Sequence, residues 1–199
     1  MRRRASVIQA WIELRAADPA AVSALAIARA GGATARAPVT LRRMRLFEIT
    51  GSDSSPGQVA TLLHGSAQFY NPHKERCVVR GTDADALPGA AGCERIVVWE
   101  RDGERRPAAE RWWRHEPGET VEVREAVVWF ATFAVDIQPG EAARDLAQLR
   151  DARHGLLCNP WSQEFRTGTE LPSIPWITPA AEARVAGEPA VQRRTRGGS

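Results

Sequence analysis

Four histidines and three cysteines are the side chains best suited to metal binding or nucleophilic catalysis in this chain. The histidines show no His-x-x-x-His or Glu-x-x-His spacing, which would place two metal ligands on one helix face. The cysteines show no Cys-x-x-Cys spacing and no pairing framework, which is typical of reduced cysteines in a cytosolic protein. Cys158 directly follows Leu156 and Leu157, so a buried, inert thiol is favoured over a nucleophile.

Two other common catalytic motifs are missing from the sequence. Gly31-Gly32 follows an expected helix instead of opening one, so it does not form a phosphate-binding loop. A Gly-x-Ser-x-Gly nucleophile elbow is also absent. Because nothing brings together an acid, a base and a nucleophile, we predict a chain that is not catalytic alone and that binds no metal or cofactor itself.

Seven tryptophans are many for 199 residues. Trp112, Trp113 and Trp129 have three interpretations: a platform on which a ligand stacks, anchors at a protein interface, or core packing. Core packing is favoured over the other two. We keep these three tryptophans as candidate interface anchors.

The net charge of +3 and the pI near 9.1 raise the question of nucleic-acid binding. Arg42, Arg43, Arg45 and the Arg-rich end are the candidate contacts, but acidic residues are interleaved with the basic ones. Binding to nucleic acid is therefore not favoured. No apolar run approaches the length of a membrane-spanning helix, and the N-terminal pattern does not resemble a signal peptide. We expect a cytoplasmic protein without a membrane partner.

The first part of the chain, residues 5–80, reads as a β-α-β-α-β unit. Asp18 and Pro19 predict the start of a helix, as an N-cap and a first-turn proline. Pro56 predicts the start of a second helix, which Asn71-Pro72 would end. The expected strands cover residues 7–14, 40–50 and 76–80.

A linker over residues 81–93 precedes a second unit over residues 94–170. Its expected strands cover residues 95–100, 122–135 and 163–166, and its helices begin at Pro107 and Pro139. Asn159-Pro160 would end the last helix. The strand from Glu122 is apolar on both faces, which predicts a central strand covered on two sides, as when two sheets pack face to face. Residues 171–199 form a tail rich in proline and arginine that we expect to be disordered.

The two units repeat the same order of elements. In each, a Pro-Gly pair opens a helix, and an Asn-Pro pair precedes a short strand. A repeated supersecondary unit indicates a fused pair related by a pseudo-two-fold axis. The predicted fold class is α/β of the α+β type, with largely antiparallel packed sheets and helices outside.

The segment Leu156-Leu157-Cys158-Asn159-Pro160, followed by Gln163-Glu164-Phe165, resembles the closing motif of PurS, the small subunit of phosphoribosylformylglycinamidine synthase. Phe69-Tyr70-Asn71-Pro72, followed by Glu75-Arg76, is a weaker copy of this motif. Asp18-Pro19 stands where the family carries Asp-Pro at its first helix. The chain is therefore similar to two PurS-like units in tandem, as in the N-terminal region of the single-chain large synthase.

The resemblance implies a non-catalytic assembly subunit in purine biosynthesis. It would bridge the ATP-dependent PurL-type synthase subunit and the PurQ-type glutaminase subunit, so that ammonia from glutamine reaches the substrate amide. ATP, Mg²⁺ and glutamine would be used by the complex and not by this chain, which could also self-associate. The expected contact residues are Asn71, Pro72, Asn159 and Pro160, with Trp112, Trp113 and Trp129. The alternatives are a regulatory domain that binds a small ligand and, after it, a basic RNA-binding module.

Overall fold

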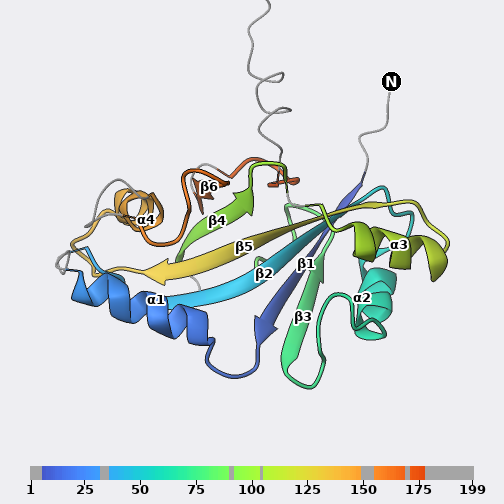
Figure 1. The fold of residues 1–199 in the computed structure, drawn as a ribbon, viewed down its shortest axis with the longest axis horizontal. Coiled ribbons are helices and arrows are strands. Elements are labelled where there is room, and N and C mark those ends of the chain that lie inside the picture. Colours follow the sequence, from blue (N-terminus) through green and yellow to red (C-terminus); the bar gives the residue numbers. More distant parts are fainter. Residues whose placement is uncertain are drawn as a thin grey trace, which may run out of the picture.

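The computed structural model of the chain describes residues 6–31, 36–89, 92–103, 105–148, 155–168 and 171–177. Within these ranges the fold is α+β: six strands form one antiparallel sheet, and four helices pack on it (Figure 1). The strands are β1 (Val7–Leu14), β2 (Thr40–Thr50), β3 (Glu75–Arg80), β4 (Glu94–Glu100), β5 (Glu122–Thr132) and β6 (Gln163–Thr167). The helices are α1 (Pro19–Ala30), α2 (Pro56–His64), α3 (Pro107–His115) and α4 (Pro139–Ala147).

The strand order in the sheet is β3-β1-β2-β5-β4-β6, and each neighbouring pair is antiparallel. The longest ladder lies in the middle, where β2 pairs with β5 from Thr40·Thr132 to Thr50·Glu122. The two halves of the chain thus meet edge to edge and share one sheet. The prediction of two sheets packed face to face is wrong, because elements other than a second sheet cover the second apolar face of β5.

Each helix begins at a proline, as predicted for all four. Asp18 caps α1 by accepting a hydrogen bond from the Ala20 N–H (2.8 Å), and Ser55 and Gln58 form a capping box at α2. The predicted ends of two helices are wrong. α2 ends at His64 and α4 at Ala147, well before the Asn-Pro pairs, which fold as separate turns in front of β3 and β6.

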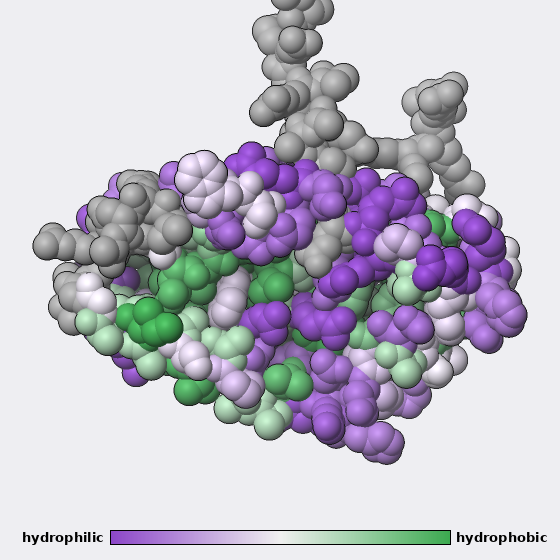
Figure 2. Space-filling view, viewed as in Figure 1, coloured by the Kyte–Doolittle hydropathy of each residue, from purple (hydrophilic) through white to green (hydrophobic). Residues whose placement is uncertain are grey.

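One face of the sheet carries two apolar clusters, and each is shared by helices from different halves of the chain. α2 and α3 cover the first cluster, which includes Leu63 and Trp113. α1 and α4 cover the second, which includes Ala24 and Leu146. This burial of apolar surface across the two halves stabilises them as one body. In Figure 2 hydrophobic side chains gather on the α1 side of the molecule, where Val22, Ile27 and Val39 are exposed.

The other face of the sheet, the helix-free face, holds a third cluster that includes Trp11, Trp99 and Phe130. Leu87 and Cys93 of the linker cover part of it. At Gly89 the backbone has φ +113°, and a Cβ there would lie 2.6 Å from the Phe130 ring, so glycine lets the linker lie directly on the sheet.

Residues 171–177, the C-terminal strap, also pack on the helix-free face. Trp176 is 3% exposed and packs edge-on against Trp11, with ring centroids 5.5 Å apart. The strap was predicted to belong to a disordered tail. That prediction is wrong for residues 171–177, because their apolar side chains complete the third cluster; residues 178–199 lie outside the described residues. No helix in the described ranges is long and apolar enough to cross a membrane.

A carboxylate fastens the segment before α2 to α3 and gives the first prediction. Glu119 accepts hydrogen bonds from the hydroxyls of Ser52 (2.6 Å) and Ser54 (2.9 Å) and from the Trp113 indole N–H (2.9 Å). Burial alone raises the pKa of this carboxyl, but the hydrogen bonds from Ser52, Trp113 and Ser54 outweigh it and hold the pKa below its ordinary value. The carboxylate therefore contributes stability above the pKa of the unfolded chain, and this contribution is lost as the pH falls through the lowered pKa.

Glu119→Gln should lower the free energy of unfolding by about 1 kcal/mol at pH 7, because the amide keeps one acceptor oxygen for three donors and loses the negative charge that strengthens these hydrogen bonds. Urea unfolding at pH 7 and at about pH 3 measures this, and the difference from the parent chain should shrink at the acidic pH. Glu116→Gln is the control, since that side chain is 55% exposed and its ion pair is with the exposed His115. Equal losses in the two variants would contradict the prediction.

Candidate functional site

The two Asn-Pro pairs form turns with the same hydrogen bonds. The Asn71 side-chain oxygen accepts from the His73 N–H (3.0 Å), and the Asn71 N–H donates to the Glu75 carboxylate (2.7 Å). In the second half, the Asn159 side-chain oxygen accepts from the Trp161 N–H (3.0 Å), and the Asn159 N–H donates to the Gln163 side-chain oxygen (2.9 Å). Asparagine suits both turns because its short side chain bonds to the backbone two residues on. Both asparagines are exposed, and both prolines are half-buried.

Sequence reasoning missed an arginine at each turn. The Arg15 side chain donates to the carbonyls of Pro72 (3.3 Å) and Glu75 (3.1 Å), and the Arg101 side chain donates to the Pro160 carbonyl (2.9 Å). The backbone N–H of each arginine also donates to the carbonyl of the residue directly before the strand that follows the turn, Lys74 (2.8 Å) or Ser162 (2.9 Å). Each arginine directly follows a strand that begins its half, β1 or β4. Aligning the two halves of the sequence would have found this shared position.

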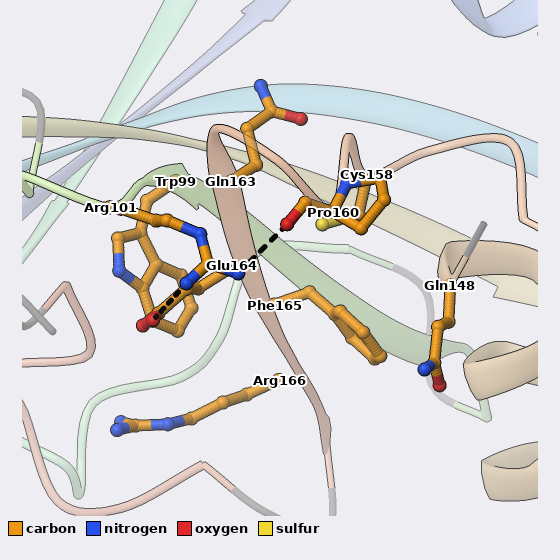
Figure 3. Close-up of a pocket in the computed structure, with 9 residues that line it drawn as sticks. All are labelled: Trp99, Arg101, Gln148, Cys158, Pro160, Gln163, Glu164, Phe165 and Arg166. Atoms are coloured by element: carbon orange, nitrogen blue, oxygen red, sulfur yellow. Dashed lines mark hydrogen bonds and ion pairs between the residues drawn. The ribbon is translucent and has the colours of Figure 1, made fainter. Parts of the chain in front are cut away.

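An open groove lies beside the second turn and holds about 300 Å³. It runs along β6, because four successive residues of that strand, Gln163 to Arg166, line it. In Figure 3, Trp99, Arg101 and Arg166 lie on one side of β6, and Phe165, Cys158 and Gln148 lie on the other. A second hollow of about 450 Å³ shares Cys158 and Gln163 with the groove and is bordered by Trp161, which is 87% exposed. We call the first hollow the β6 groove.

The β6 groove has more basic than acidic side chains. Arg101 lies 3.8 Å from Glu164, a long ion pair between side chains that are 47% and 28% exposed. Arg166 lies over the Trp99 ring, with its guanidinium carbon 5.4 Å from the centroid. Two guanidinium groups and one carboxylate therefore line this side of the groove, and neither guanidinium is deeply buried. This arrangement can attract an anionic group on the helix-free side of β6.

Each half has one apolar residue directly before the Asn-Pro pair and another on the strand that follows. The large side chain stands first in one half and second in the other. Tyr70 precedes the first Asn-Pro pair, and Cys77 lies on β3; in the second half the corresponding positions hold Cys158 and Phe165. Burial raises the pKa of Cys77 to about 12, with a contribution from Glu75, and burial raises the pKa of Cys158 to about 11. Both thiols are therefore protonated at neutral pH and are poor nucleophiles, which supports the prediction of an inert Cys158.

The three candidate tryptophans lie at the contact between the helices and the sheet, two of them on α3 and one on β5. Trp113 is fully buried, Trp129 is 8% exposed, and Trp112 is half-buried, with its ring centroid 5.6 Å from that of Trp113. Their rings serve the core, which is the interpretation that the sequence favoured. They do not lie together: Trp112 and Trp113 belong to α3 and pack in the cluster that α2 and α3 cover, and Trp129 belongs to the cluster of α1 and α4. Their part as interface anchors stays a prediction.

The basic residues of β2 already have acidic partners. Arg42 pairs with Glu13, Arg43 lies 3.3 Å from Asp18, and Arg45 lies 2.8 Å from Glu125. Paired guanidinium groups hold less unbalanced charge for phosphates to attract. His64 contacts the Tyr70 hydroxyl at 3.0 Å, and His154 lies outside the described residues. The described part of the chain has no group of three or more His, Cys, Asp or Glu that could hold a metal ion.

The chain was compared with family models, with curated proteins and with solved structures, and none of the three comparisons found a match.

Proposed function

We propose that the chain is a tandem PurS-like assembly subunit that bridges a PurL-type synthase and a PurQ-type glutaminase in the cytoplasm. The complex would use ATP, Mg²⁺ and glutamine to convert an amide of its substrate, and this chain would contribute contacts and no catalysis. The proposal rests on the resemblance of the two Asn-Pro motifs and on one structural observation, the matching register of the two halves.

The matching register supports a pseudo-two-fold axis within the chain. In the first half Ile12 pairs with Cys77 on one side and Arg45 on the other; in the second half Val98 pairs with Phe165 and Val127. Arg45 and Val127 are themselves partners in the central ladder. One row across the sheet is therefore Cys77, Ile12, Arg45, Val127, Val98, Phe165.

This row relates the two turns to each other. Cys77 and Phe165, at its two ends, each lie six residues after the asparagine of an Asn-Pro turn. A two-fold axis through the Arg45·Val127 pair would exchange the two turns, together with Arg15 and Arg101. A fused pair of equal units should have this arrangement. The exposed asparagines would then present two equivalent contact sites at opposite edges of one sheet.

A pull-down from native lysate tests the proposal. The tagged full-length chain is used as bait with ATP, Mg²⁺ and glutamine present, and bound proteins are identified by mass spectrometry. Recovery of the synthase and glutaminase subunits would support the bridging role. A bait that stays alone while both subunits are abundant in the flow-through would overturn it.

Variants of the turns locate the contacts. Asn71→Ala and Asn159→Ala each remove an exposed amide that bonds only locally, so each should cost about 1 kcal/mol of stability or less. Loss of one subunit with Asn71→Ala and of the other with Asn159→Ala would assign one partner to each turn. Full recovery of both subunits by the double variant would place the contacts elsewhere on the chain.

A small-ligand regulatory domain is the second candidate, and the β6 groove is the observation that favours it. Its volume of about 300 Å³ suits a small ligand, and Gln163, Glu164 and Arg101 offer polar groups along its wall. The test is a thermal-shift screen of nucleotides and amino acids. A rise in melting temperature that Arg101→Glu abolishes would support this function.

A further inference from the structure

We infer that the outer edge of β6 binds an extended acidic-apolar peptide segment of a partner protein by adding it as a seventh strand. The inference concerns the β6 groove alone, so it holds whichever complex the chain serves. It rests on three features of this strand: its open backbone edge, the different chemistry of its two sides, and the difference between it and β3 at the opposite edge.

The outer edge of β6 offers unpaired backbone groups at Phe165, in the middle of the strand, whereas the Gln163 N–H at its start is bonded to the Asn159 carbonyl (2.8 Å). β6 is the last strand of the described sheet, and among the described strands it pairs with β4 alone. The Arg101 N–H donates to the Ser162 carbonyl (2.9 Å), and in an antiparallel pair alternate residues direct their N–H and C=O groups to the partner strand. Glu164 and Arg166 therefore bond to β4, whereas the N–H and C=O of Phe165 point outward. Among the described residues, none donates to or accepts from these outward groups of Phe165. Such an edge is a template for another strand.

The two sides of β6 determine which peptide fits. Arg101 and Arg166 lie on the helix-free side with one carboxylate of the groove lining, Glu164; Arg101 also donates to the Pro160 carbonyl (2.9 Å) and Arg166 to the Trp176 carbonyl (3.5 Å), so each keeps further N–H groups for a ligand. Phe165 and Cys158 lie on the other side, next to the exposed side chains of Leu156 and Trp161. Side chains of an added strand alternate between the two faces of the sheet. The matching peptide therefore alternates acidic residues, which face the two arginines, with apolar residues, which face Phe165.

The opposite edge of the sheet is a natural control. At β3 the residues that correspond to Glu164, Phe165 and Arg166 are Arg76, Cys77 and Val78. Arg76 is paired with Glu13 at 2.8 Å, and Glu75 stands where Gln163 stands in β6. The β3 edge therefore lacks both the excess of arginine over carboxylate and the large apolar ring that line β6. We assign peptide binding to β6 and not to β3.

The first test uses the full-length chain and a fluorescein-labelled six-residue peptide of alternating glutamate and valine. Its fluorescence anisotropy should rise on binding, and a lysine-valine peptide of the same length should bind at least about tenfold more weakly. Two N-methylated peptides, one modified at every glutamate and one at every valine, test the hydrogen bonding. Only one set of N–H groups can face β6, so one modified peptide should bind and the other should not. Equal binding by both modified peptides would overturn strand addition.

The second test uses three variants. Arg101→Glu should weaken binding of the glutamate-valine peptide about tenfold, and Arg15→Glu, which loses an equivalent contact to an Asn-Pro carbonyl, should leave it unchanged. Glu164→Gln should strengthen binding about threefold, a gain that misfolding cannot produce. Equal losses with Arg101→Glu and Arg15→Glu would overturn the assignment. A second result would also overturn it: the chain is a dimer by light scattering, Arg101→Glu makes it a monomer, and no peptide binds. The occupant of the β6 edge would then be a second copy of the chain.

Discussion

Trp176→Ala should lower the free energy of unfolding by about 3–5 kcal/mol, the largest effect of any substitution in the strap. The indole is almost completely buried, packs edge-on against Trp11 and lies under the Arg80 guanidinium, whose carbon is 5.7 Å from its centroid. Its N–H donates to the Pro172 carbonyl (2.9 Å) within the strap. Removing the ring leaves a cavity over the helix-free face and takes away the main apolar contact of the strap, so both losses add.

Trp161→Ala is the matched control for this experiment, since it removes the same side chain from a position that is 87% exposed. Its free energy of unfolding should stay within about 0.5 kcal/mol of the parent chain. Urea unfolding followed by circular dichroism measures both variants, and Trp176→Phe should lose less than Trp176→Ala because it keeps an aromatic ring. A loss below about 1 kcal/mol in Trp176→Ala would mean that the strap contributes little to the fold.

The strap matters for the two halves as well as for stability. It follows β6 at one edge of the sheet, yet Trp176 contacts Trp11 of β1 and Arg80 of β3 in the other half. The Ile174 N–H also donates to Asp83 of the linker (3.3 Å). The linker and the strap thus cross the helix-free face from the two halves and meet. Where a second sheet was expected, the chain covers its own apolar surface.

Local signals predicted the elements of this fold well. Asp18-Pro19 and Ser55-Pro56 act through bonds within one turn, so the helix starts could be predicted. The strands β1 and β5 were also visible in the sequence, because the period of a strand is fixed, although residues 7–12 of β1 are buried on both faces. The helix ends were misplaced, since the apolar residues after His64 continue the helical spacing although Gly65 has already ended α2.

Long-range pairing could not be predicted in the same way. A strand with two apolar faces does not specify what covers each face, so β5 was compatible with a second sheet as well as with the strap. The same limit applies to the candidate site. The Asn-Pro pairs were found because they are local, whereas Arg15 and Arg101 reach their turns across the sheet, from β1 to β3 and from β4 to β6. Likewise, only the sheet order identifies β6 as an edge.

Glu48→Leu should lower the free energy of unfolding by about 3–5 kcal/mol, because each orphaned buried donor costs about 1–3 kcal/mol. Glu48 is 1% exposed and accepts from the Gln9 side-chain amide (2.7 Å) and from the backbone N–H groups of Trp176 (2.7 Å) and Ile177 (2.9 Å). Leucine fills a similar volume but accepts none of these bonds. Urea unfolding measures the loss, and a cost below about 1 kcal/mol would show that the strap N–H groups find other partners.

Glu48→Gln separates the hydrogen bonds from the charge. Burial raises the pKa of Glu48 above its ordinary value, against the lowering by hydrogen bonds from Trp176, Gln9 and Ile177 and by the charge of Arg124. Because the pKa of Glu48 is higher in the folded chain than in the unfolded chain, its protonation stabilises the fold. This contribution to the free energy of unfolding is complete below the pKa of the unfolded chain and diminishes as the pH rises through the pKa of the folded chain. A protonated carboxyl still has lone pairs on both oxygens, whereas the glutamine NH₂ group accepts nothing. The parent chain should therefore exceed Glu48→Gln in stability by more at about pH 4 than at pH 8. The opposite trend would mean that the hydrogen bonds from the strap outweigh burial and that the strap is held by a carboxylate charged at all physiological pH values.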